Sequence, residues 1–421
     1  MLLMTSAHPA TRMAHLGLGA FHRAHQAWYT QRANDAGDSP WGIAAFTGRR
    51  PDVARALSAQ DCQYTLVTRD ASGDSTEHIR SIVAAHDGAD ADSWRRVLTD
   101  PAVTVVTLTV TEAAYGDTPV IRRLADGLAA RRAAGAGPIA VVSCDNLPRN
   151  GAHTRRALLQ ASGGLADWLD DEVSFVDTVV DRITPATTDD DIAATGDPCT
   201  VVTEPFAEWY LSGEFPGGRP LWEACGARIV SDIDVFTRRK LWLLNAGHSL
   251  LAYAGLARGH AHIDEAMRDA SCRRWLDELW DDVDPVLPLP PDEKEQARRT
   301  LVARFENPRI KHRLAQIARD GSEKLTERSA PIVAGRIRAG ASPGTGQIRL
   351  WGAWLVHLRS RWTPDEDPGA SAIAARARHD IDDGAAAVVD HLLPRDVAGE
   401  PRLNHLASAV AAAAAEIGGT P

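Results

Sequence analysis

Three polar residues in one predicted helix have the types and the spacing that acid–base chemistry on an alcohol requires. Lys240, Asn245 and His248 follow one another in the segment RKLWLLNAGHS. On an α-helix that advances about 100° per residue, Asn245 lies about 140° from Lys240 and His248 about 80° from it, so all three can point into one cleft. Hydride transfer from a secondary alcohol needs a base for the hydroxyl proton, and a desolvated lysine can supply it. Asn245 and His248 can hold the oxygen as negative charge develops on it.

The scarcity of lysine favours a function for Lys240. Of the 46 lysine and arginine residues, four are lysines, at positions 240, 294, 311 and 324. A buried lysine can lose its proton, whereas arginine does not deprotonate in proteins. The alternative interpretation is an amphipathic helix whose polar residues face solvent or cap neighbouring elements.

Two further polar residues follow predicted buried strands. Asn146 comes after the strand predicted at 139–143, and Asp181 directly follows the strand predicted at 175–180. Ligands of α/β folds bind at the carboxyl ends of parallel strands, so both residues are candidates for a site. Each also has a structural interpretation, because Asn-Gly and Asp-Asn sequences favour turns and Asp181 can form an ion pair with Arg182.

The first predicted strand is joined to the first predicted helix by a glycine turn of the kind that binds dinucleotides. The residues of this turn are Leu16, Gly17, Leu18, Gly19, Ala20, Phe21 and His22. Glycines allow a tight turn and a close backbone approach, and a helix N-terminus receives the pyrophosphate. The third glycine of the full pattern is replaced. We expect the cofactor at this turn, with Asn146 also in contact with it.

The sequence after the second predicted strand leaves the choice between NAD and NADP open. An acidic residue here usually binds the ribose of NAD, but the segment Thr47-Gly48-Arg49-Arg50 has no acid before Asp52. Arg49 can bind a 2′-phosphate or belong to a solvated turn. We expect NAD to be preferred and NADP to be possible.

These residues must be positioned by two different kinds of domain. Residues 1–235 alternate strands and helices, which predicts a Rossmann-like α/β domain with a mostly parallel sheet. Residues 236–421 have helical periodicity almost throughout and predict a helical substrate domain. The predicted strands span residues 12–18, 41–47, 75–84, 103–110, 139–143, 175–180 and 200–203. The predicted helices span residues 21–36, 54–59, 94–100, 120–134, 237–256, 264–282, 292–305, 309–319, 347–361, 371–392 and 403–417.

Composition limits the possible partners and compartments. The chain has 421 residues and a net charge of −10, which disfavours binding to nucleic acid. Five scattered cysteines and the lack of an HExxH motif give no disulfide framework and no metal site. Without a long apolar run or a signal-like N-terminus, we expect no membrane contact and a cytoplasmic location. Phosphate loops, GxSxG elbows and Tyr-Lys pairs four residues apart are missing as well.

Several segments together resemble a known family. They are GLGAFHRAHQAWY, TLTVTEAAYG, SCDNLPRNG, VDRITPAT, VTEPFAEW, RKLWLLNAGHS and RFENPRIKHRLAQIARDGSEKL. The chain is similar over about residues 15–325 to the polyol-specific long-chain dehydrogenases, which include mannitol 2-dehydrogenase, arabinitol dehydrogenase and fructuronate reductase (D-mannonate oxidoreductase). Residues 50–61 and 310–318 look most like the fructuronate reductases.

This resemblance implies metal-independent hydride transfer between a nicotinamide cofactor and a C2 alcohol or ketone. By motif, Lys240 would be the base, Asn146 and Asn245 the donors to the oxyanion, and His248 a substrate-positioning group. Asp181 would lie beside the nicotinamide. The implied partner is a small sugar acid or polyol, and the implied assembly is a monomer or a small homo-oligomer.

The chain also departs from the family pattern at two positions, which bears on the substrate. The family often has Glu where this chain has Thr237, and a substrate-binding Arg where it has Val356. Because a buried carboxylate needs a cationic partner, we predict that Arg313 or Arg359 supplies the charge for a sugar acid. The alternatives are a mannitol or arabinitol dehydrogenase and a non-catalytic nucleotide-binding regulator.

Overall fold

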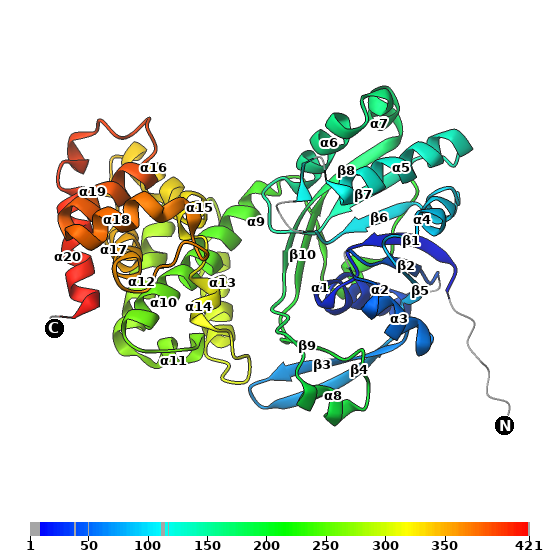
Figure 1. Ribbon diagram of the computed structural model, residues 1–421, viewed down its shortest axis with the longest axis horizontal. Helices are drawn as coiled ribbons and strands as arrows, with labels where there is room; N and C mark the ends of the chain where they lie inside the picture. Colours follow the sequence, from blue (N-terminus) through cyan, green and yellow to red (C-terminus); the bar gives the residue numbers. More distant parts are fainter. Residues whose placement is uncertain (1–8, 38, 49, 111–113, 117, 420–421) are drawn as a thin grey trace. The chain divides into compact units, whose positions relative to one another are not determined.

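The chain folds into two compact units, residues Met1–Phe236 and Thr237–Pro421. The structure is a computed structural model, and it describes residues 9–37, 39–48, 50–110, 114–116 and 118–419. The first unit is an α/β domain and the second is helical (Figure 1). No helix in these described ranges combines the length and the apolar character needed to cross a membrane.

The first unit is built on a large, mostly parallel sheet. In its described residues the sheet has eight strands in the order β11-β10-β8-β7-β6-β1-β2-β5, and the antiparallel pair is β8 with β10. Its strands are β1 (Thr11–Leu16), β2 (Gly42–Phe46), β5 (Ile82–His86), β6 (Val105–Leu108), β7 (Ile139–Ser143), β8 (Val173–Asp181), β10 (Glu208–Ser212) and β11 (Arg228–Ile229). Since β1 continues to β2 on one side and lies beside β6 on the other, the strand order reverses between β1 and β6, where such sheets bind ligands.

Helices cover both faces of this sheet (Figure 1). Met13 of β1 packs into one core, whereas Ala14 and Leu16 pack into the other, as the alternation of side chains along a strand requires. One face carries α1 (Ala20–Ala24), α2 (Gln26–Ala36) and α3 (Asp52–Ala59). The other carries α4 (Ala91–Leu98), α5 (Pro119–Ala134), α6 (Asn150–Ala161) and α7 (Ala166–Glu172).

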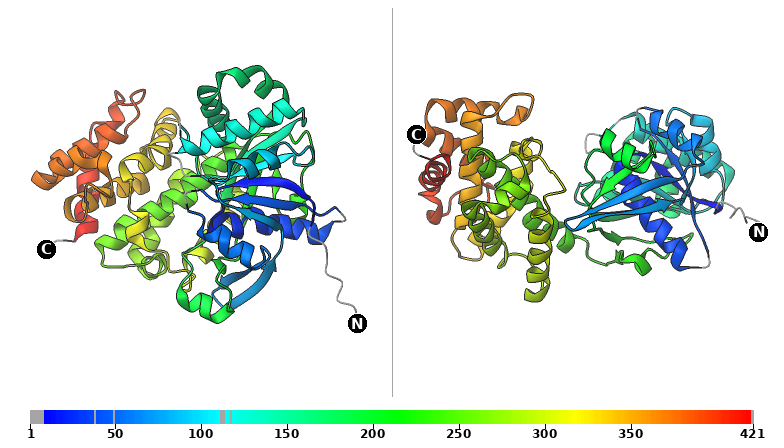
Figure 2. Two further views of the ribbon diagram at one scale, coloured as in Figure 1. Left: turned by 45° about the vertical axis from the view of Figure 1, so that its right-hand side comes forward. Right: turned by 90° about the horizontal axis from the view of Figure 1, so that it is seen from below.

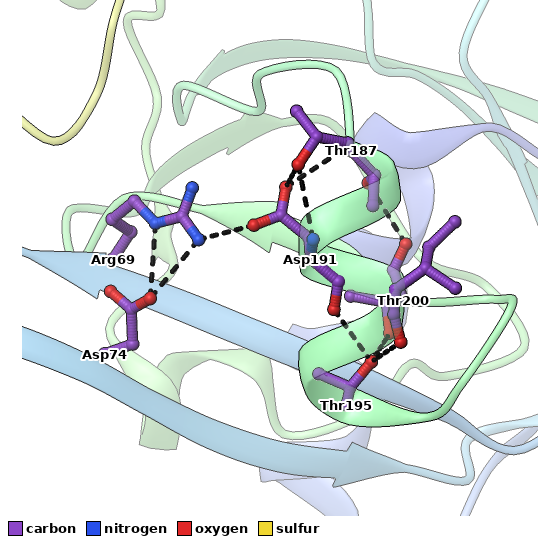
Figure 3. A network of polar contacts seen from close by, with 8 residues as sticks. Arg69, Asp74, Thr187, Asp191, Thr195 and Thr200 are labelled. Atoms are coloured by element: carbon purple, nitrogen blue, oxygen red, sulfur yellow. Dashed lines mark hydrogen bonds and ion pairs between the residues drawn. The ribbon is translucent and has the colours of Figure 1, made fainter.

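A smaller sheet in the same unit contains β4 (Gly73–Ile79), β3 (Tyr64–Asp70) and β9 (Val201–Thr203), in that order. Arg69 on β3 donates to Asp74 on β4 at 3.2 Å and to Asp191 at 2.6 Å (Figure 3). Asp191 also accepts the backbone N–H of Thr188 at 2.9 Å and so caps α8 (Asp189–Thr195). The network therefore fixes α8 against the hairpin.

The second unit consists of helices packed around α10 (Ala246–Ala257), and Figure 2 shows it from two further sides. Residues Ala246 to Leu256 of α10 are all buried, so this helix is the centre of the core. The unit begins within α9 (Asp234–Arg239) and includes η4 (Lys240–Asn245), which leads into α10. The other helices are α11 (Ile263–Arg268), α12 (Ala270–Val283), α13 (Pro291–Phe305), α14 (Leu314–Ile317), α15 (Gly321–Arg328), α16 (Ala330–Arg338), α17 (Thr345–Ser360), α18 (Ser371–His379), α19 (Ile381–Leu392) and α20 (Leu406–Gly418).

Two long helices predicted from periodicity are broken by side chains that bind the backbone. Asp269 accepts N–H groups of Ser271 and Cys272, so 264–282 is divided into α11 and α12. Asp380 accepts the N–H of Asp383 and divides 371–392 into α18 and α19. Such N-caps start a new helix by satisfying its first donors.

Other predicted elements differ from those observed, and several observed elements were not predicted. The strand at 75–84 is two strands, β4 and β5, in different sheets. The helix at 309–319 is only α14, because Arg313 is extended and pairs with His262 in an isolated bridge. Strands β3, β10 and β11 and helices α6, α7, α8, α15 and α16 had no predicted counterpart.

Candidate active site

The glycine turn lies at the switch point of the large sheet. Gly17 and Leu18 both donate to the carbonyl of Phe46, at 2.9 and 2.8 Å, which holds the turn against β2. On the β6 side, the hydroxyl of Thr109 donates to the carbonyl of Gly17 at 2.7 Å. Gly17 has φ +110°, and a Cβ there would lie 2.2 Å from the carbonyl oxygen of Thr109, so no other residue fits.

These features fit a dinucleotide. The space around Gly19 is larger than that around Gly17, since a Cβ there would meet only the Gly17 oxygen, at 3.6 Å. The first-turn N–H groups of α1, from Ala20 to His22, have no acceptor within the helix and are suited to bind the pyrophosphate. Leu16 and Leu18 are buried and support the turn. Arg49, predicted to affect the choice of cofactor, lies outside the described residues.

Asn146 lies in a tightly held loop after β7. The loop is closed by Asp145, whose carboxylate accepts the N–H of Leu147 at 3.0 Å, and by the buried side chain of Asn150. Asn150 donates to the carbonyls of Asp145 and Thr178, at 3.3 and 3.2 Å. Asn146 itself is exposed at the carboxyl edge of the sheet.

Asp181 ends β8, the strand next to β7, so the structure brings it to the same sheet edge as Asn146 and Gly17. It is half-buried and lies opposite Glu208 of β10. The next residue, Arg182, is buried and donates to the carbonyls of Ala24 and Glu204, at 2.5 and 3.3 Å. Arg182 thus joins the end of β8 to α1 rather than pairing with Asp181 alone.

Lys240 and Asn245 occupy a π-helical segment, η4, and not the α-helix that the sequence predicted. The N–H of Ala246 bonds to the carbonyl of Leu241, five residues back. In a π-helix residues five apart lie one above the other, so Asn245 lies on the same face as Lys240 and not about 140° from it. His248 follows Asn245 by three residues in α10, on the same face. The π segment therefore aligns all three.

Donors from elsewhere in the unit bind the carbonyls of the π segment. The indole N–H of Trp280, on α12, donates to the carbonyl of Leu243 at 3.0 Å. The guanidinium of Arg328, on α15, donates to the carbonyl of Asn245 at 3.3 Å and to the hydroxyl of Ser249 at 3.0 Å. These bonds stabilise a helix geometry that leaves backbone acceptors without regular α-helical partners.

His248 lies in an apolar and cationic environment. Its ring is 8% exposed and packs at 4.6 Å on the ring of Phe305 and at 5.2 Å, edge to face, on that of His312. Burial lowers the pKa of His248 well below its ordinary value, and the charges of His312, Arg304 and Arg328 lower it further. The imidazole is therefore neutral near pH 7 and can orient a substrate hydroxyl.

The two arginines predicted to bind a carboxylate lie in different places. Arg313 is exposed and follows His312, the residue that contacts His248. Arg359, near the end of α17, lines a groove of about 690 Å³ with residues of α18, α19 and α20. His357, two residues earlier, packs on Tyr253, beyond His248 along α10. The structure brings Arg313 to the His248 segment and does not bring Arg359 there.

Arg304 and Arg328 were not predicted from the sequence. Arg304 is buried at the end of α13, and Arg328 ends α15. Arg304 begins the last segment that carried the family resemblance and Arg328 follows its end, but no local pattern separates either from surface arginines. In the described part of the chain, no three His, Cys, Asp or Glu side chains gather as a metal site would require.

A parallel sheet with a glycine turn at its switch point and a helical unit with Lys, Asn and His on one face are the parts that a nucleotide-dependent alcohol dehydrogenase needs. Residues 11–224 match the model of the mannitol dehydrogenase Rossmann domain, and residues 232–375 match that of the mannitol dehydrogenase C-terminal domain. The chain belongs to the mannitol dehydrogenase family, whose members act on polyols and sugar acids.

Named relatives have several substrates. The chain is 37% identical to D-arabinitol 4-dehydrogenase of Ralstonia nicotianae, over 79% of this chain and 80% of that one. It is 33% identical to D-mannonate oxidoreductase of Escherichia coli, over 79% and 77%. The solved structure of Pseudomonas fluorescens mannitol 2-dehydrogenase with NAD and D-mannitol superposes with a TM-score of 0.81, at 29% identity over 97% of this chain and 92% of that one.

Proposed function

We propose that this protein transfers a hydride between NAD and C2 of a sugar acid, with D-fructuronate and D-mannonate as the substrate pair. The observation that supports the reaction is the common face of Lys240, Asn245 and His248, created by the π segment. The observation that supports an acidic substrate is the cationic environment of His248.

Each residue has a distinct proposed role. Lys240 accepts the proton of the substrate hydroxyl, and Asn245 and Asn146 donate hydrogen bonds to the oxygen as it gains charge. Neutral His248 orients a neighbouring hydroxyl, and Asp181 lies toward the nicotinamide end of the substrate. The residues from Leu16 to His22 would hold the dinucleotide, which accepts or supplies the hydride when bound. A lysine base makes a metal-independent reaction feasible.

The charges around His248 favour an acid over a neutral polyol. Arg304 and Arg328 both act on the pKa of His248 through their charges, and Arg313 lies one residue from His312. Burying a carboxylate without a cation costs several kcal/mol, whereas a guanidinium can bind it through two parallel hydrogen bonds. A neutral polyol needs no such group.

A sugar alcohol is the second candidate. It is favoured by the relative named D-arabinitol 4-dehydrogenase and by the solved structure that contains D-mannitol. The proposed roles of Lys240, Asn245 and Asn146 are the same for either substrate, because only the group beyond the reacting carbon differs.

A screen of substrates and cofactors tests the proposal. NADH oxidation is measured with hexuronates and ketoses, and NAD reduction with aldonates and polyols. We expect the highest kcat/KM with a hexuronate and a preference for NAD over NADP. Preference for a neutral ketose or polyol would support the second candidate, and a clear NADP preference would implicate Arg49 and Arg50. Failure to turn over any substrate would favour a nucleotide-binding regulator.

A further inference from the structure

Two fully buried histidines are stacked beneath the glycine turn. His15, on β1, and His22, on α1, have ring centroids 3.3 Å apart and ring planes within 10° of parallel. Neither side chain is exposed, and Gln26 and Thr107 beside them are equally buried. Burying so many polar groups is unfavourable unless they are hydrogen-bonded, so the arrangement calls for a physical reason.

One end of this cluster holds the glycine turn. Because the hydroxyl of Thr109 donates its proton to the carbonyl of Gly17, at 2.7 Å, it must accept from Nε2–H of His15, at 3.1 Å. Nδ1 of His15 then accepts from the hydroxyl of Thr107, at 2.8 Å. The tautomer of His15 is thereby fixed, and the place of Thr109 relative to Gly17 depends on it.

The other end of the cluster reaches the strand opposite Asp181. Nδ1–H of His22 donates to Gln26 at 3.3 Å, and Gln26 donates to Nδ1 of His25 at 3.1 Å. Nε2–H of His25 donates to the carbonyl of Glu208 at 3.0 Å, and Glu208 pairs with Asp181. His25 also lies at the break between α1 and α2, with φ −121° and ψ −87°, so the chain of bonds spans that break.

We propose that His15 is a positioning residue for the cofactor, which holds the glycine turn in place through Thr109 while the stacked ring of His22 packs against it. This inference rests on the proposed assignment of residues Leu16 to His22 to the dinucleotide. The two rings are stacked and not hydrogen-bonded to each other, so the cluster transmits position and carries no proton. Phenylalanine could stack in the same place but could not hold Thr109.

The test measures NADH binding to the full chain by fluorescence titration without substrate. Thr109→Val keeps the shape of the side chain and removes the hydroxyl, and His15→Leu removes the donor to that hydroxyl. We expect each to raise the Kd for NADH about tenfold, as the loss of one buried hydrogen bond predicts. His15→Gln keeps a donor near the Nε2 position and should recover most of the affinity. The double variant Thr109→Val/His15→Leu should bind no more weakly than either single variant, because both break one pathway.

A buried histidine outside this cluster provides the control. His357 of the helical unit is 7% exposed and packs on Tyr253, so His357→Leu should lower Tm while leaving the Kd for NADH unchanged. The proposal is overturned if Thr109→Val and His15→Leu lower Tm but bind NADH like the wild type, or if their effects on Kd simply add. If His15→Leu does not fold, His15→Phe decides in its place, because it keeps a stacked ring and lacks the donor to Thr109. A wild-type chain that binds neither NADH nor NADPH would instead refute the proposed function.

Discussion

At the scale of single residues, the proposed chemistry depends most directly on Lys240. It begins the π segment and shares a face with Asn245 and His248. We expect Lys240→Ala to lower kcat by roughly 10²–10⁴-fold, the range that general-base catalysis contributes, with NADH affinity retained. The check is to measure steady-state kinetics of Lys240→Ala and of the control variant Lys294→Ala. Lys294 on α13 donates to the backbone of Asp284 and is not part of the proposed site. Turnover near the wild-type value in Lys240→Ala would remove this residue from the mechanism.

The partner of a substrate carboxylate is also a question of single residues. Arg313 adjoins His312 at the His248 segment, whereas Arg359 lines the groove beside α20. We therefore expect Arg313→Ala to raise KM for a hexuronate about tenfold or more and to change KM for a neutral ketose little, since a charge-assisted hydrogen bond is lost only with the acid. Arg359→Ala serves as the matched comparison and should affect neither substrate. The reverse pattern would assign the carboxylate to Arg359, and equal small effects would favour a neutral substrate.

At the scale of elements, the proposed catalysis depends on the π segment, which carries Lys240 and Asn245. Trp280 on α12 donates to the carbonyl of Leu243 and so supports the π geometry. Trp280→Phe keeps the packing but removes that donor, and we expect kcat to fall several-fold with little change in the Kd for NADH.

Trp275 is a matched control on the same helix. It is equally buried, and its indole N–H has no hydrogen-bond partner among the described residues. Trp275→Phe should therefore lower kcat less than Trp280→Phe, as stopped-flow or steady-state measurements can establish. Equal losses in both variants would show that general packing, and not the bond to Leu243, sets the position of Lys240.

At the scale of the whole molecule, buried neutral histidines in both units make stability depend on pH. Burial lowers the pKa of His15 from its ordinary 6.5 to about 3 and that of His357 to about 4, and it lowers the pKa values of His22 and His248 as well. The unfolded chain then binds more protons than the folded one below pH 6.5. Stability is full above pH 6.5 and falls as the pH drops toward the folded pKa values.

This dependence can be measured by thermal unfolding. Each such histidine contributes about 1.4 kcal/mol per pH unit across that window, so two per unit should lower Tm by on the order of 10 °C between pH 7.5 and pH 5.0. His357→Gln should reduce the slope, because its unfolded state no longer gains a proton there. Equal Tm values at both pH values would contradict the neutral, buried state of these rings.

The sequence by itself determined the features that local pattern can carry. The alternation of predicted strands and helices indicated a parallel sheet, and the Gly17 turn indicated the cofactor. The spacing of Lys240, Asn245 and His248 indicated the chemistry. Each signal depends on residues within about ten positions, where backbone geometry alone relates one side chain to the next.

Only the tertiary structure decided how these residues are brought together. The backbone hydrogen bonds of a π-helix span five residues and those of an α-helix span four. Donors from Trp280 and Arg328, 37 and 83 positions from their acceptors, bind the carbonyls of this segment. His15 meets Thr109 across 94 positions in the same way. Hydrogen bonds between distant segments depend on how whole elements pack, which local periodicity does not encode.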